Sequence, residues 1–277
     1  MNDFRHKTYD LAFSLGAACS CSQALRIAGL QYASFPFDWL CHAPFIRRID
    51  AIAADFAHWM DPSDIFFVRD KLGYLNHICG NSRWGFEYHH DFPVGLPWES
   101  SLSDVQAKYR RRCNRMLSML RQSKRVLAVY VDLPDRPVVA DAELLKAHGV
   151  LASHFPNADI DLLYVGYQDG LSFEERLERE IGPSITSIVF DCRDRGPDAL
   201  PLGIDYRRLA KLLFSKTSVV DYRSADEKRA FAAQNRKERY ARFAASTPSQ
   251  LFVNRLQYKI WRFFARRLAR KGIVCRV

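Results

Sequence analysis

Short apolar segments alternate with amphipathic ones in the second half of the chain, and this alternation limits the possible folds more than any other feature. Three apolar runs of strand length are each followed by a helical pattern. The runs are residues 125–132, 160–166 and 185–191, and the helical patterns are residues 140–154, 172–180 and 206–213. Strands that alternate with helices predict an α/β fold, with a mostly parallel central sheet and helices on both faces.

The first half of the 277-residue chain adds a fourth strand at residues 10–15, which Gly16 ends. Pro36 predicts an extended segment over residues 34–40, because proline cannot continue a helix. Further helices are predicted at residues 20–29, 44–59 and 100–122, and short strands at residues 65–69 and 86–90. No linker-like segment precedes residue 220, so we predict one α/β domain over residues 1–220 and a helical extension over residues 221–277.

Composition disfavours several classes of protein. No apolar stretch reaches the roughly 20 residues of a membrane-spanning helix, and the N-terminus lacks the apolar core of a signal peptide. The seven cysteines have no disulfide-framework spacing, so we expect a cytoplasmic protein. Cys19 and Cys21 form CxC, which is not the usual pair of a zinc site, and the chain has no Walker loop and no GxGxxG. We therefore expect neither a metal nor a cofactor.

The basic charge is concentrated at the C-terminal end. The net charge is +10, and residues 251–277 hold eight Lys or Arg and no acid, which leaves +2 for the rest. Residues 248–271 are predicted to form an amphipathic helix. Three roles stay open: the apolar face docks on the body, the helix lies on an anionic membrane surface, which would make the protein peripheral at the inner face, or it contacts nucleic-acid phosphates. The first role is favoured and nucleic acid is the least favoured.

Cys19 marks a candidate site at a strand-to-helix turn. In open α/β sheets, ligands bind beyond the carboxyl ends of the strands, and the loop Gly16-Ala17-Ala18 leaves such an end. A cysteine in the first helical turn feels the positive end of the helix dipole, which favours the thiolate, and nearby amides could hold an oxyanion. Alternatively, Cys19 only fills space in the core, as cysteines often do. Cys21 points elsewhere and is predicted to be structural.

A cysteine nucleophile needs a base, and the adjacent pair His89 and His90 is the best candidate. Alternation along a strand puts the two on opposite faces, so only one can face Cys19. Asp38 lies in the apolar run of residues 35–40, where a carboxylate must be paired or hydrogen-bonded. It is expected to orient a histidine, cap a turn or pair with Arg26.

Further residues are expected to bind substrate. Asp132 ends the strand at residues 125–132, at the carboxyl edge of the predicted sheet, and it could bind substrate or orient the base. The predicted substrate-binding set is Gly16, Ala18, Arg26, Asp91 and Asp132.

Two motifs carry a resemblance to a bacterial family described as putative papain-like cysteine peptidases. The first combines Ser14-Leu15-Gly16-(two residues)-Cys19 with Ser34-Phe35-Pro36-Phe37-Asp38-Trp39, and the second is His90-Asp91-Phe92. The resemblance implies Cys19 as nucleophile and His90 as base. The family usually has Asn immediately before the cysteine, where this chain has Ala18, so an Asn side chain cannot donate to an oxyanion here.

These features predict a cysteine-dependent hydrolase or acyltransferase that acts on a small-molecule, peptide or glycan substrate. Peptidase activity rests on analogy, because one fold hosts many activities. The alternative is a non-peptidase α/β protein that binds a nucleotide-sugar or glycan in cell-surface polysaccharide biosynthesis. A binding module with an inactive site is a third reading.

Overall fold

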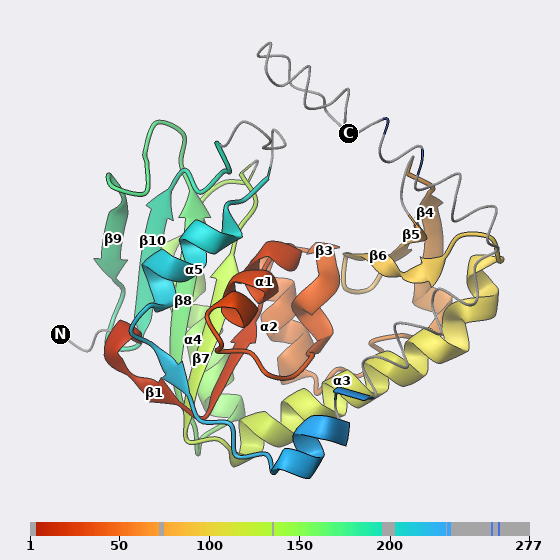
Figure 1. Cartoon of the computed structure of the whole chain (residues 1–277), viewed down its shortest axis with the longest axis horizontal. Helices are drawn as coiled ribbons and strands as arrows, with labels where there is room; N and C mark the ends of the chain where they lie inside the picture. The colour runs from red at the N-terminus through yellow and green to blue at the C-terminus, as the bar shows by residue number, and fades with distance from the viewer. Residues whose placement is uncertain are drawn as a thin grey trace.

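The computed structural model describes residues 4–71, 75–134, 136–195, 203–230 and 232–233, together with residues 256 and 260. Its main sheet has five strands in the order β2-β7-β8-β10-β9 (Figure 1). The first four are mutually parallel, and β9 is an antiparallel edge strand. The strands are β2 (Leu11–Ser14), β7 (Arg125–Val131), β8 (Asp159–Tyr167), β10 (Ile185–Phe190) and β9 (Leu177–Glu180). The predicted mixed α/β fold with a mostly parallel sheet is confirmed.

Both faces of the main sheet are buried, which explains the continuous apolar runs in its strands. Along β7, Val126, Ala128 and Tyr130 join one core cluster, whereas Leu127 and Val129 join the other. The first cluster includes side chains of α2 (Phe45–Ala53), α3 (Leu102–Gln122) and α4 (Asp141–His154), and the second includes side chains of α1 (Cys19–Ile27) and α5 (Tyr206–Phe214).

A second sheet occupies the region of residues 40–93. Its four antiparallel strands, at the right of Figure 1, have the order β3-β6-β5-β4. They are β3 (Leu40–His42), β6 (Phe86–Pro93), β5 (Asn76–Asn81) and β4 (Ile65–Arg69). The strands predicted at residues 65–69 and 86–90 are present, but the sequence prediction missed β3, β5 and the sheet that they complete. A two-stranded parallel pair, β1 (Thr8–Tyr9) with β11 (Ser218–Val219), lies near the chain start.

A bulge interrupts the pairing of β5 with β6. Cys79 pairs with Tyr88 and His77 pairs with Phe92, so three residues of β6 lie opposite Ile78 alone. A bulge breaks the simple alternation of side chains along a strand. Alternation therefore cannot assign faces to His89 and His90.

Two predicted elements in the first half are wrong. Residues 36–39 form a 3-10 helix, not an extended segment, because Pro36 is suited to the first helical position and the Asp38 carboxylate accepts the Phe35 N–H. The helix predicted at residues 44–59 ends at Ala53, because Asp55, Phe56 and His58 have left-handed φ values of 49°, 57° and 57°.

The predicted helix at residues 172–180 is also wrong. Ser172 accepts turn hydrogen bonds from the N–H groups of Glu174 and Glu175, and the chain then runs as β9 along β10. The helices predicted at residues 20–29, 100–122, 140–154 and 206–213 are present, within a residue or two at each end.

The predicted amphipathic helix at residues 248–271 lies outside the described residues, apart from Leu256 and Ile260. The domain division at residue 220 stays a prediction. In the part of the chain that the structure describes, no helix is both long and apolar enough to cross a membrane.

Candidate active site

The loop before Cys19 extends the main sheet past the end of β2. The Leu15 N–H donates to the Val129 carbonyl at 2.7 Å, and the Ala17 N–H donates to the Val131 carbonyl at 3.1 Å. A Cβ atom on Gly16 would lie 2.3 Å from the Cβ of Cys21. Gly16 is therefore required for close packing of the loop on α1. This geometry places the first residue of α1, Cys19, at the carboxyl edge of the sheet.

Cys19 is half-buried at the start of α1. Ala18 precedes it in an extended conformation and gives the helix no side-chain cap. Burial raises the pKa of the Cys19 thiol, and the hydrogen bond from its own backbone only partly opposes this. Desolvation therefore opposes the thiolate that the helix dipole was expected to favour, and a stabilised thiolate stays a prediction.

Cys21, in contrast, is fully buried. Its thiol donates to the Val129 carbonyl at 3.3 Å, and burial raises its pKa to about 12. These contacts agree with the structural role predicted for it.

Asp38 is fully buried and has three hydrogen-bond partners. One carboxylate oxygen accepts from Arg26 Nη2 and from the Phe35 N–H, each at 3.0 Å, and the other accepts from Gln31 Nε2 at 2.8 Å. Burial raises the pKa of Asp38, although Arg26 opposes the shift. Of the predicted roles, the structure shows the turn cap and the pair with Arg26. An orienting role toward a histidine stays a prediction.

A chain of contacts leads from Cys19 to His90. The Ser22 hydroxyl lies 3.1 Å from the Cys19 carbonyl oxygen and 2.8 Å from the Asp38 carbonyl oxygen. The next residue, Trp39, meets the half-buried His90 edge to face, with ring centroids 5.8 Å apart. The Arg26 guanidinium lies over the same indole, 5.3 Å from its centroid. Cys19, Asp38, Arg26 and His90 thus belong to one neighbourhood.

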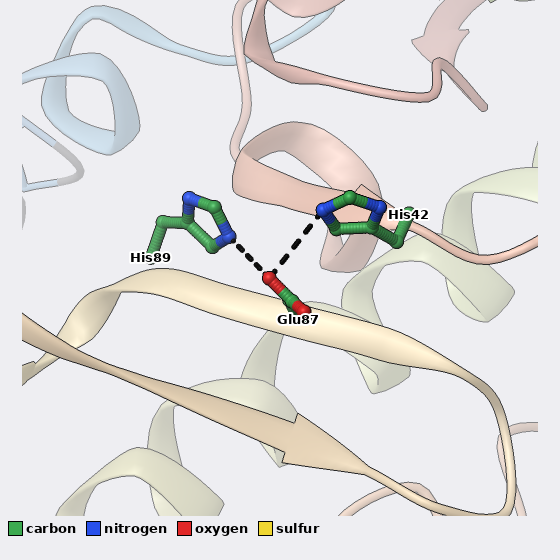
Figure 2. Close-up of side chains that lie close together, drawn as sticks. All are labelled: His42, Glu87 and His89. Carbon is green, nitrogen blue, oxygen red and sulfur yellow. Dashed lines mark hydrogen bonds and ion pairs between the residues drawn. The ribbon is translucent and has the colours of Figure 1, made fainter. Parts of the chain in front are cut away.

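A second polar cluster lies on the open face of the small sheet and was missed by sequence reasoning. Figure 2 shows His42 and His89 turned toward the same oxygen of Glu87. His89 Nε2 is 2.9 Å from Glu87 Oε2, and His42 Nε2 is 3.4 Å from it. Burial lowers the pKa of His89, although Glu87 opposes the shift. Sequence reasoning named His89 only as a candidate base. The bulge in β6 and the pairing with β3, which bring His89 together with Glu87 and His42, leave no local sequence pattern.

Cys41 connects this cluster to Cys19. It pairs directly with Glu87 across β3 and β6. Burial raises the pKa of the Cys41 thiol to about 12, and negative charge on the nearby Cys19 would raise it further.

Asp91 and Asp132, both predicted to bind substrate, are buried and satisfied internally. Asp91 accepts from Lys108 Nζ and, at 2.8 Å, from the Tyr109 hydroxyl, and these bonds tie β6 to α3. Asp132 does lie at the carboxyl edge of the main sheet, but it accepts from Tyr130 and from the Leu133 N–H. These contacts give both carboxylates structural roles, and substrate binding by either one stays a prediction.

A cleft of about 800 Å³ lies at the opposite edge of the main sheet, away from Cys19. Its lining includes Asp10, Lys124 and Arg125, where β2 and β7 begin. In open α/β sheets the carboxyl edge is the usual place for ligands. We therefore place the candidate site at Cys19 and not in this cleft.

The fold and the site define a class: an α/β protein whose half-exposed cysteine starts the helix after the first strand of a mostly parallel sheet. Residues 10–146, just under half of the chain, match the model of the family described as "Putative papain-like cysteine peptidase (DUF1796)". The match covers Cys19, Asp38, Glu87, His90 and Asp132. Comparisons with curated proteins and with solved structures give no match.

Proposed function

We propose that this protein is a cysteine-dependent hydrolase or acyltransferase in which Cys19 is the nucleophile and His90 the general base. One observation supports the proposal: Cys19 is the partly exposed first residue of an uncapped helix, and contacts through Ser22, Asp38 and Trp39 link its backbone to His90. The family description supports the same reaction class.

The raised pKa of Cys19 determines how the reaction would begin. A thiol that burial keeps protonated must lose its proton during attack, so a base is required at that moment. His90 accepts the thiol proton as the sulfur–carbon bond forms at the acyl carbon of the substrate. The electron pair of the carbonyl moves to its oxygen, where the N–H groups of the first turn of α1 stabilise the negative charge.

The second half of the reaction restores the enzyme. The tetrahedral intermediate breaks its bond to the leaving group, which takes the proton from His90 and leaves a thioester on Cys19. Water, or the hydroxyl or amine of an acceptor, then attacks the thioester while His90 accepts its proton. The sulfur–carbon bond breaks, and the thiolate regains the proton from His90.

Asp38 and Arg26 would act as positioning residues. Asp38 holds the turn that carries Trp39, and Arg26 covers the indole that packs on His90. Arg26 is more than one-third exposed, so its guanidinium could also meet an anionic group of a substrate.

A reactivity experiment tests the nucleophile. The full-length protein is treated with limiting iodoacetamide, and the modified cysteine is located by peptide mass mapping. Hydrolysis of an activated p-nitrophenyl ester is followed for a burst of acyl-enzyme. We expect the adduct and the burst to require Cys19 and to disappear in Cys19→Ala. Cys41→Ala is the matched control, because Cys41 is also partly exposed, and it should retain both signals.

The base is tested separately. Removing a general base typically costs a factor of about 10² to 10⁴, so His90→Ala should slow acylation by that factor, whereas His77→Ala should not. If His89→Ala is the variant that loses acylation, the base is the His89–Glu87 pair. If Cys19→Ala labels and turns over like the parent protein, the proposal fails.

A further inference from the structure

We propose that His42, Glu87 and His89 form a binding site for a divalent transition-metal ion. The proposed reaction of Cys19 and His90 uses none of these three side chains. Each offers one ligand atom, and all three atoms lie within 4.8 Å of one another (Figure 2). The inference is independent of the proposed function.

The distances suit a metal with little adjustment. In a tetrahedral zinc site, bonds of about 2.0–2.1 Å place neighbouring ligand atoms about 3.4 Å apart. Glu87 Oε2 is 3.4 Å from His42 Nε2 and 2.9 Å from His89 Nε2. The two imidazole nitrogens lie within 4.8 Å of each other, so an ion at the centre would draw the two rings together.

The scaffold fixes His42 over the open face of the small sheet. His42 and Ala43 have left-handed φ values of 61° and 43°, a conformation that non-glycine residues adopt only where the surroundings impose it. Arg48 Nη2 donates to the His42 carbonyl at 2.9 Å, Arg136 Nη1 donates to the Ala43 carbonyl at 3.0 Å, and the Ala43 N–H donates to Gly85 at 3.0 Å. This fixed turn therefore positions the ring of His42, although the His42 side chain is 51% exposed.

Glu87 and His89 are held equally well. They flank the buried Tyr88 on β6, and their side chains lie close together (Figure 2), with His89 Nε2 2.9 Å from Glu87 Oε2. The His89 side chain is 12% exposed. Glu87 and His89 are half-buried ligands on β6, and His42 is an exposed ligand on the neighbouring β3. The exposed side of His42 gives an ion a route of entry.

The donor set selects the kind of ion. Two imidazoles and one carboxylate suit Zn²⁺, Fe²⁺ and Co²⁺, whereas Mg²⁺ and Ca²⁺ prefer oxygen ligands. Three protein ligands also leave coordination positions open, as in catalytic rather than structural sites.

Two neighbouring cations oppose the ion: Arg69, and Lys71, whose charge acts on both Glu87 and His89. Arg69 Nη2 lies 3.5 Å from the same oxygen of Glu87. A metal must displace this contact, so the guanidinium should weaken binding. If the cluster binds a metal, removal of Arg69 should strengthen metal affinity. If it is only a cluster of ion pairs, removal of Arg69 should leave metal affinity unchanged.

Metal titration of the full-length, tag-free protein tests the proposal. After treatment with a chelator and its removal, Zn²⁺ binding is measured by calorimetry, and the Co²⁺ form is examined by absorption spectroscopy. We expect one ion per chain, an affinity loss of at least about 100-fold in His42→Ala and in His89→Ala, and a gain of up to about fivefold in Arg69→Ala. His77→Ala is the matched control, because His77 also contacts a carboxylate, that of Asp70, at 2.5 Å, and it should bind like the parent protein.

Thiols also bind zinc, so the double variant Cys19→Ala with Cys41→Ala separates the two possibilities. Retained binding and a Co²⁺ spectrum without a thiolate band support the His–Glu–His site. Loss of binding in this double variant overturns the proposal, as does weak binding of several ions or equal affinity in the histidine variants. Unfolding temperatures of the metal-free variants show whether any loss of affinity reflects misfolding.

Discussion

The two sheets of this protein expose their faces differently. In the main sheet, six of the seven residues of β7 are buried, because helices cover both faces. In the small sheet, β6 buries Phe86 and Tyr88. It leaves Glu87 and His89, which lie on either side of Tyr88, partly exposed. A parallel sheet with two covered faces can present chemistry only at its strand ends. An antiparallel sheet with one open face can present it along the strands.

The candidate site draws on both possibilities. The main sheet supplies Cys19 at a strand end, and the small sheet supplies the histidines from a strand. Arg48 joins the two sheets: its guanidinium is fully buried and lies over Phe86 of the small sheet, at 4.9 Å, and Tyr130 of the main sheet, at 5.9 Å. A site at such a junction depends on the inner packing of the small sheet as much as on the turn before α1.

The largest effect is expected from breaking the buried ion pair behind β6. Asp91→Asn leaves the ammonium group of Lys108 buried without a carboxylate, and removal of one partner of such a pair typically costs about 3–5 kcal/mol. Urea denaturation measures the free energy of unfolding. Arg121→Ala is the control, because the Arg121–Asp55 pair is exposed on both sides and should cost less than about 1 kcal/mol. Equal losses in the two variants would show that the small sheet does not depend on its buried charges.

A smaller loss is expected from Gly16→Ala at the turn of the main sheet. The added methyl would lie 2.3 Å from the Cβ of Cys21, and overpacking of this kind costs about 1–3 kcal/mol. Because the clashing atom is the Cβ, Cys21→Gly should relieve the clash in a double variant, whereas Cys21→Ala should not. Gly149→Ala is the control: its Cβ meets nothing within 4 Å, and in helix α4 it should stabilise the protein by about 1 kcal/mol. Thermal unfolding of the five proteins tests this order.

The same contrast explains what could be predicted from the sequence. The main sheet follows from continuous apolar runs, and the position of Cys19 follows from the end of one run. The small sheet is harder, because its strands depend on partners distant in the sequence. The bulge that places three β6 residues opposite Ile78 is set by this pairing, so alternation could not assign His89 and His90. The end of α2 at Ala53 depends on left-handed residues that no helical pattern reveals.

Buried polar residues were identified more easily than their roles. Asp38 was recognised because a carboxylate in an apolar run needs partners, and two of the partners found, Arg26 and the Phe35 amide, lie close in sequence. Asp91 and Asp132 were placed near the site, but their partners include Lys108, Tyr109 and Tyr164, which come from other elements. Only tertiary packing assigns those roles.

The raised pKa of Cys19 predicts how its alkylation depends on pH. Only the thiolate reacts, so the rate grows about tenfold per pH unit below the pKa and levels off above it. An unperturbed cysteine levels off near pH 8.5. Because burial raises the pKa of Cys19, its rate should be low at neutral pH and still increase above about pH 9. Iodoacetamide labelling at several pH values, resolved by mass spectrometry, measures this, with the urea-unfolded chain as reference. A rate that is already constant at neutral pH would instead show a thiolate stabilised by the helix dipole.

The smallest effect concerns the residue before Cys19. Ala18 occupies the cap position of α1 with φ −154° and ψ −179°, and no side chain caps the helix. Asn is among the best residues at this position, so Ala18→Asn should stabilise the protein by about 0.5–1 kcal/mol. Its amide N–H groups would also add a donor beside Cys19, so ester turnover should increase a few-fold if the oxyanion forms there.

A matched cap separates these two consequences. Ala140 is the uncapped residue before α4, also extended, and it lies on an exposed part of the chain. Ala140→Asn should give the same gain in unfolding free energy with unchanged turnover. If both variants raise stability and neither changes turnover, the first turn of α1 does not hold the oxyanion. The contribution of the main sheet would then be limited to placing Cys19, and the small sheet would have to supply the rest of the chemistry.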